Sequence, residues 1–107
     1  MTQAAAIRKE KIRDLAANAA EAADMLKLLA HEGRLLILCH LVVEGELSVG
    51  VLAERVGLSQ SALSQHLAKM WDAGLVVRRR ESQTVFYRIG DARVSRILST
   101  LKDIYCP

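Results

Sequence analysis

The two cysteines of this chain, Cys39 and Cys106, are its best candidates for chemistry. A cysteine thiolate can attack sulfur, form a disulfide or bind a soft metal. Neither cysteine belongs to a CxxC pair, and two are too few for the disulfide framework of a small secreted protein. The sequence therefore predicts two free thiols, and the simplest interpretation makes Cys39 a small core residue and Cys106 incidental.

The other candidates for catalysis or metal binding are the three histidines. A cluster of His31, Cys39 and His40 is a poor metal site because adjacent helix residues such as Cys39 and His40 point about 100° apart. The chain has no Ser/His/Asp arrangement, HExxH motif, glycine-rich phosphate loop or carboxylate pair that would support catalysis. We expect a protein that is not an enzyme and that carries no metal site and no cofactor.

The segment SQSALSQHLAKMW, residues 59–71, has the periodicity of an amphipathic helix. Its predicted inward face is apolar and consists of Leu63, Leu67, Met70 and Trp71. The opposite face is short, polar and free of acidic groups, and it carries Ser61, Ser64, Gln65 and Ala68. Ordinary solvent faces are rich in Glu and Lys, whereas serine and glutamine can approach DNA closely and bond to bases or phosphates. This face favours a DNA contact, with a serine-rich solvated face as the alternative.

A basic run, Arg78 to Arg80, ends the strand-like segment that follows this helix. Next to a polar helix, such a run would contact phosphates, with Gln83 and Thr84 near the tip of the ribbon. A structural role and a phosphate contact are equally compatible with His66. The predicted partner is double-stranded DNA, and the predicted contacts are Ser59, Gln60, Ser61, Ser64, Gln65, His66, Lys69, Arg78, Arg79, Arg80, Gln83 and Thr84.

The elements around this segment follow a recognisable order. Helical periodicity covers residues 10–30 and 31–43, and Ser48 and Ser59 can cap two further helices that meet at Gly57. Alternating residues predict strands over 75–80 and 84–89, and Asp91 can cap a last helix. The predicted fold is mainly α with a two-stranded β-wing: a winged helix-turn-helix forming one domain over 1–107, with the helix-turn-helix at about 48–73 and the wing at about 75–89. Apolar faces on the first and last helices, about 10–30 and 91–106, predict a homodimer through these helices.

Size and charge agree with this interpretation. A chain of 107 residues is near the lower limit for one self-supporting core, and its net charge of +3 permits an anionic partner. No apolar run is long enough to span a bilayer, and residues 1–26 lack the apolar centre of a signal peptide. We expect a cytoplasmic protein with no membrane partner.

From about residue 22 onward, the sequence resembles the ArsR/SmtB family of bacterial dimeric repressors. The segments LSQSALSQHL and RRRESQTVFY carry the resemblance most strongly. It implies a homodimer that binds an imperfect inverted repeat and is released by an inducer. Arsenic and cadmium sensors of the family read ELCVCDL where this chain reads ELSVGVL, and zinc sensors carry histidines on the last helix, which has none here. Serine and glycine cannot replace thiolate ligands.

With Cys39 and Cys106, the chain is similar instead to the BigR, SqrR and HlyU subgroup, which senses reactive sulfur species through two cysteines. The resemblance implies a repressor that is relieved by a persulfide or an oxidant when the two cysteines become linked by a disulfide or polysulfide. Our hypothesis for this chain is that Cys39 attacks the persulfide and Cys106 completes the bridge. Two alternatives remain: a metal-responsive repressor of the same family, and a constitutive winged-helix DNA-binding protein with structural cysteines.

Overall fold

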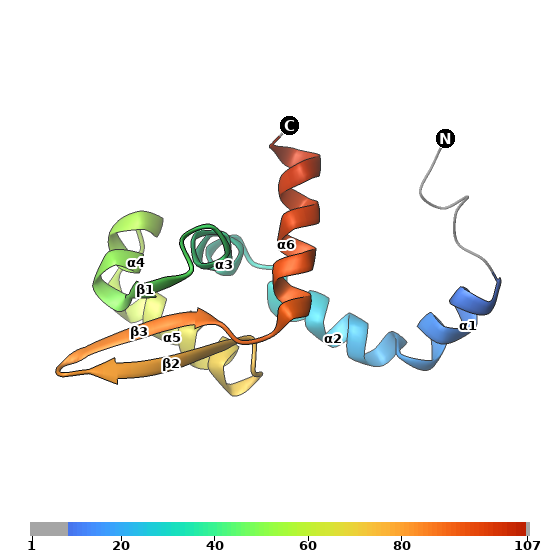
Figure 1. The fold of residues 1–107 in the computed structure, drawn as a ribbon, viewed down its shortest axis with the longest axis horizontal. Helices are drawn as coiled ribbons and strands as arrows, with labels where there is room; N and C mark the ends of the chain where they lie inside the picture. The colour runs from blue at the N-terminus through green and yellow to red at the C-terminus, as the bar shows by residue number, and fades with distance from the viewer. Residues whose placement is uncertain (1–8, 107) are drawn as a thin grey trace. The chain divides into compact units, whose positions relative to one another are not determined.

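The structure, a computed structural model, describes residues 9–106. The chain divides into two compact units, Met1–Ala30 and His31–Pro107. The elements of the first unit are α1 (Lys9–Ala17) and α2 (Ala19–Leu29) (Figure 1). Those of the second are α3 (Glu32–Glu44), β1 (Glu46–Ser48), α4 (Val49–Val56), α5 (Gln60–Asp72), β2 (Val76–Glu81), β3 (Thr84–Ile89) and α6 (Ala92–Tyr105). The predicted class, mainly α with a β-hairpin wing, is confirmed.

The first unit corrects one prediction: residues 10–30 form two helices, α1 and α2, and not one. The break falls at Asn18, whose backbone N–H donates to the carbonyl of Leu15 at 3.0 Å. The side-chain amide of Asn18 donates to the carbonyl of Asp14, also at 3.0 Å. Asparagine interrupts helices in this way because its side chain competes for nearby backbone groups.

Side-chain caps mark the start of helices in the second unit. Asp91 caps α6 as predicted, by accepting the N–H of Arg93 at 2.9 Å, and His31 caps α3 by accepting the N–H of Gly33 at 3.2 Å. Gly45, which follows α3, has a φ of 88°, a conformation that glycine adopts without a steric penalty. These caps set the direction in which each helix leaves the turn before it.

The sheet differs from the predicted two-stranded ribbon because it has three antiparallel strands in the order β1-β3-β2. The two wing strands pair from Val76 with Ile89 to Glu81 with Thr84. On the other side of β3, Leu47 of β1 lies opposite Tyr87. A strand of three residues is too short to show alternation in the sequence, so only its pairing with β3 reveals it.

The core of the second unit is built by α3, α4, α5, α6 and the base of the wing. Its fully buried side chains include Ile37, Leu38, Leu41, Leu52, Leu63, Leu67, Met70, Leu75, Val76 and Val94. Three of the four residues predicted to face inward on α5 belong to this set, but Trp71 does not. Trp71 is 42% exposed, and its ring lies under the guanidinium of Arg78 on the wing.

Candidate nucleic-acid interface and thiol pair

Helix α5 is held at the surface by the turn that the sequence predicts. Ser48 caps α4 by accepting the N–H of Val51 at 3.2 Å, and Gly57 ends this helix in the left-handed conformation, with a φ of 68°. Ser59 then caps α5 by accepting the N–H of Ala62 at 3.1 Å. The helix-turn-helix therefore has both of its predicted serine caps and its predicted glycine turn.

The outward face of α5 carries most of the predicted DNA-binding residues. All of those on this helix except His66 are exposed, together with the cap: Ser59, Gln60, Ser61, Ser64, Gln65 and Lys69. Leu63, Leu67 and Met70 on the opposite face are buried and fix the rotation of the helix. The fold thus brings these polar residues to one surface, while the hydroxyl of Ser59 already accepts a bond within the helix.

His66 is half-buried and joins α5 to α3. Its Nδ1 accepts a hydrogen bond from Nε of Arg34 at 3.2 Å, and its ring contacts that of His31 edge-on, with centroids 4.4 Å apart. Burial lowers the pKa of His66, and the neighbouring His31, Arg34 and Lys69 lower it further. These effects disfavour the charged ring, in agreement with the role of Nδ1 as acceptor for Arg34. These contacts favour the structural role that the sequence left open for this residue.

Arg78 connects the wing to the end of α5. Its guanidinium lies over the ring of Trp71, 4.1 Å from the ring centroid, and its Nη1 donates to the hydroxyl of Tyr87 at 3.3 Å. Tyr87 is itself buried in the core. A guanidinium stacked on an indole is attracted by the ring electrons, so Arg78 holds the wing against the helix.

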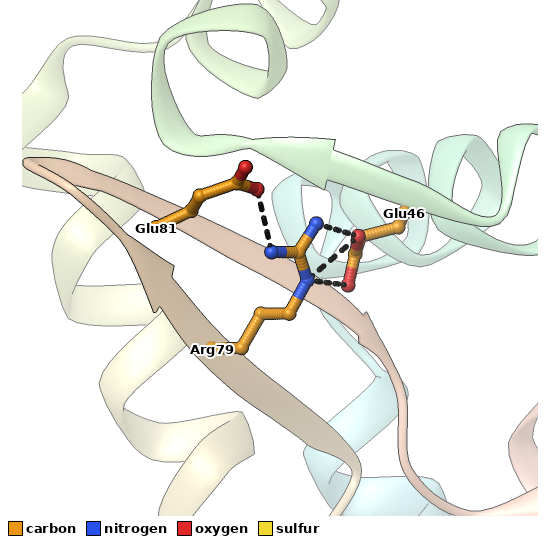
Figure 2. A network of polar contacts seen from close by, with 3 residues as sticks. All are labelled: Glu46, Arg79 and Glu81. Atoms are coloured by element: carbon orange, nitrogen blue, oxygen red, sulfur yellow. Dashed lines mark hydrogen bonds and ion pairs between the residues drawn. The ribbon is translucent and has the colours of Figure 1, made fainter.

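Arg79 forms a network of polar contacts with Glu46 and Glu81 (Figure 2). Its Nε donates to both carboxylate oxygens of Glu46, at 3.1 and 3.0 Å, and its Nη2 donates to Oε1 of Glu46 at 2.7 Å. Its Nη1 donates to Glu81 at 2.8 Å. The hydrogen bonds from Arg79 lower the pKa of Glu46, and the two carboxylates raise the pKa of Arg79. The guanidinium also lies over the ring of Phe86, 4.5 Å from its centroid.

The tip of the wing lies near the start of α5. A groove of about 500 Å³ is lined by Ser48, Val49, Gly50, Gln60, Gln83, Thr84 and Val85. Three residues predicted to contact DNA, Gln60 of α5 and Gln83 and Thr84 of the wing, therefore line one groove. Ser48, which the sequence predicts as a helix cap, also lines it, as do Val49 and Gly50, for which the sequence predicts no DNA contact. Arg80 is exposed on the strand that leads to this tip.

The two cysteines are free thiols in neighbouring elements of the second unit. Cys39 is half-buried on α3, and the exposed Cys106 ends α6, its backbone N–H donating to the carbonyl of Lys102 at 2.8 Å. Helices α3 and α6 pack against each other. Burial raises the pKa of the Cys39 thiol, the charge of Cys106 raises it further, and Lys102 opposes both effects.

Within residues 9–106, no three side chains of His, Cys, Asp or Glu come together in a way that could hold a metal ion. Within the same residues, no helix has the length and apolar character required to cross a bilayer.

A helix-turn-helix with an exposed polar second helix, flanked by a basic wing, defines a winged-helix DNA-binding regulator and not an enzyme. The chain belongs to the ArsR family of bacterial regulatory proteins: the family profile matches residues 31–77. The relationship extends well beyond this segment. The transcriptional regulator YgaV of Escherichia coli K12 is 45% identical over 97 residues, which cover 91% of this chain and 98% of YgaV.

Solved structures of relatives agree with this assignment. Reduced HlyU from Vibrio cholerae is 47% identical, with a TM-score of 0.82 over 89% of this chain and 99% of HlyU. The transcriptional repressor BigR from Xylella fastidiosa is 39% identical, with a TM-score of 0.84 over 89% of this chain and 96% of BigR. The resemblance to the ArsR/SmtB family and the winged helix-turn-helix fold are therefore confirmed.

Proposed function

We propose that the protein is a homodimeric transcriptional repressor that leaves its DNA operator when Cys39 and Cys106 become covalently linked through sulfur. The observation that carries this proposal is the placement of the two free thiols: Cys39 lies on α3, Cys106 follows the last residue of α6, and these two helices pack against each other. One relative, HlyU, has a structure described as that of the reduced protein, and another, BigR, is described as a repressor. The description of HlyU supports a response to redox state, and that of BigR supports repression.

The proposed DNA surface combines the exposed face of α5 with the tip of the wing. The residues proposed to contact DNA directly are Gln60, Ser61, Ser64, Gln65, Lys69, Arg80, Gln83 and Thr84. Serine and glutamine side chains on α5 are suited to base edges in the major groove, and the wing residues to the adjacent backbone. An inverted repeat is the expected operator because a twofold dimer presents two such helices, about 34 Å apart.

The proposed dimer uses apolar side chains that each unit leaves exposed. In the first unit, Ile12, Leu15 and Leu26 are each more than half exposed. In the second, Ile104 and Tyr105 near the end of α6 are 62% and 76% exposed. Exposed apolar surface on small proteins commonly marks a contact with another chain. Since Cys106 follows Tyr105 directly, a bond to Cys39 would act on the helix that carries the proposed dimer contacts.

The accessible thiol is proposed to react first. Cys106 is exposed, whereas burial raises the pKa of Cys39 and so lowers its thiolate fraction. The Cys106 thiolate takes the outer sulfur of glutathione persulfide and releases glutathione thiolate. The Cys39 thiolate then attacks the Sγ of Cys106 and expels hydrosulfide, leaving a disulfide. If Cys106 carries two added sulfurs, attack on the nearer one leaves a trisulfide. This order is the reverse of the one expected from the sequence.

The test measures DNA affinity before and after treatment with glutathione persulfide. The probe is a labelled duplex selected by the wild-type protein from a random library, followed by fluorescence anisotropy. We expect treatment to weaken wild-type binding by about 5- to 150-fold, the usual range of allosteric coupling. The matched variants Cys39→Ser and Cys106→Ser are isosteric, and each is expected to keep its affinity. Mass spectrometry should find an intrasubunit link between the two cysteines that a reductant reverses.

Other outcomes would contradict the proposal in distinct ways. Release of DNA by both single variants would show that the thiol pair is not the switch. Unchanged affinity in the treated wild type would favour a constitutive DNA-binding protein with structural cysteines. Release by a metal salt alone, with both thiols still titratable, would favour a metal-responsive repressor.

A further inference from the structure

We propose that Arg78 and Arg79 are positioning residues that hold the wing in place, and that Arg80 alone of this run contacts the DNA phosphates. The inference rests on the DNA binding proposed above, and it assigns different roles to three adjacent arginines. Sequence alone assigns all three to phosphate, because a run of identical cations gives no reason to separate them.

Arg79 is already neutralised within the protein. All three of its guanidinium nitrogens donate to carboxylate oxygens, two of them to Glu46 and one to Glu81 (Figure 2). The charge of Arg79 is therefore shared between two carboxylates, one of which, Glu46, also lies opposite Arg88 in the register. Three of the five N–H donors of Arg79 are engaged within the protein, so a phosphate would have to compete with two carboxylates for this guanidinium.

The same contacts give Arg79 a structural task. Glu46 lies on β1 and Arg79 on β2, the two outer strands of the sheet, which do not pair with each other. The ion pair spans the central strand β3, above the ring of Phe86, which is opposite both Arg79 and Ser48 in the register. Arg79 therefore clamps the wing to the strand that leads into α4 of the helix-turn-helix.

Arg78 fixes the wing to the other helix of the motif. Its stack on Trp71 ties β2 to the end of α5, and its bond to Tyr87 joins β2 to the buried ring on β3. The ring of Trp71 covers one face of the guanidinium. Together, Arg78 and Arg79 connect the wing to both helices of the helix-turn-helix, and this sets the position of the wing tip relative to α5.

Arg80 differs from its two neighbours. It is exposed, and within residues 9–106 no hydrogen bond, ion pair or ring contact engages its guanidinium. In the register it lies opposite Val85, one pair from the end of the hairpin. Its charge is thus available to bind a phosphate. It also lies close to Gln83 and Thr84 at the tip of the wing, which is proposed to contact the backbone of the duplex.

The salt dependence of DNA binding separates these roles. Each phosphate contact contributes about −0.9 to the slope of log affinity against log salt, or about 3.5-fold between 50 and 200 mM salt. With the selected duplex as probe, Arg80→Gln should reduce the slope by about 0.9 per bound subunit. Arg80→Lys should restore it, because lysine serves phosphate as a point charge. Arg79→Gln should weaken binding while leaving the slope at the wild-type value.

Lysine at position 79 provides a second discrimination. A positioning residue needs the planar fork that binds Glu46 and Glu81 together, so Arg79→Lys should weaken binding as much as Arg79→Gln does. Arg78→Gln and Trp71→Leu should behave like each other, again with an unchanged slope. Thermal unfolding of every variant establishes that the weaker binders are folded.

Removal of the two carboxylates supplies a test by gain of function. In Glu46→Gln/Glu81→Gln, Arg79 is released, so adding Arg79→Gln to this background should reduce the slope by about 0.9 per subunit. The same substitution in the wild type should not. This comparison keeps the overall charge change of Arg79→Gln identical in both backgrounds.

Two results would overturn the assignment. A slope reduced by Arg79→Gln or Arg78→Gln in the wild type, and restored by lysine, would make that arginine a phosphate contact. An Arg80→Gln variant with the wild-type slope would remove Arg80 from the interface. Failure of the wild type to select any duplex would instead refute the proposed function itself, which is a distinguishable outcome.

Discussion

Ser59 offers a direct test of whether its hydroxyl serves the fold or the DNA. Ser59→Ala removes the oxygen that accepts the N–H of Ala62 at 3.1 Å and leaves that amide without its cap. The cap is exposed, so water replaces part of the lost bond, and we expect a cost of about 1 kcal/mol in the free energy of unfolding. For a domain of this size, that is a decrease in Tm of about 4–8 °C.

Ser61→Ala is the matched control for this prediction, because it removes an equivalent hydroxyl two positions further along the same helix. Ser61 is exposed in the first turn of α5, and the cap bond of this helix comes from Ser59, so stability should change by no more than a few tenths of a kcal/mol. If Ser61 contacts DNA, its loss should reduce affinity by about 2- to 10-fold, the value of one hydrogen bond.

Ser59→Asp then separates stability from binding. Aspartate caps a helix as well as serine does and interacts favourably with the helix dipole, so the Tm should return to the wild-type value or exceed it. Its carboxylate should repel phosphate and weaken DNA binding. Thermal unfolding followed by circular dichroism and anisotropy on the selected duplex give the two readouts. A Ser59→Ala variant with the wild-type Tm would refute the capping argument.

Three further predictions concern α3 and its contact with α5. Folding lowers the pKa of His66, so the unfolded chain binds a proton more readily than the folded chain does. The free energy of unfolding should therefore fall as the pH drops below about 6.5, and His66→Asn, which keeps an acceptor for Arg34, should lose this pH dependence. Gly33→Ala places a Cβ 3.0 Å from Nε2 of His66, so it should displace the ring and reduce stability by about 1–3 kcal/mol; a stability unchanged from wild type would show that the ring moves freely. Leu38→Ala should cost about 2–5 kcal/mol in urea unfolding, because Leu38 is 0% exposed, whereas Leu36→Ala at a 43% exposed site should cost much less; equal costs would contradict the burial argument.

The helix boundaries were predictable because their signals are local. Ser48, Ser59 and Asp91 each bond to an amide two or three residues away, and Gly57 supplies its own left-handed conformation. Such contacts depend on a few neighbouring residues and therefore survive in the sequence. The same reasoning failed at Asn18, where an asparagine inside an otherwise helical pattern gave too weak a signal to predict the break.

The candidate site was predicted in its composition but not in the roles of its members. The polar residues of α5 and the tip of the wing were identified from residue type and periodicity, and the fold places them on a shared surface. The environments of Trp71, Arg78 and Arg79 were not identified. Each depends on which strand of the sheet, or which end of α5, lies beside the side chain.

By itself, the sequence determined the order of the elements, the caps, the polar face of α5 and the presence of two free cysteines. Only the tertiary structure decided that β1 joins the sheet, that Glu46 neutralises an arginine 33 residues later, and that Cys39 is half-buried beside α6. The reason is physical: backbone propensity and capping act over a single turn, whereas the charge, burial and pKa of a side chain depend on segments that meet only when the chain folds.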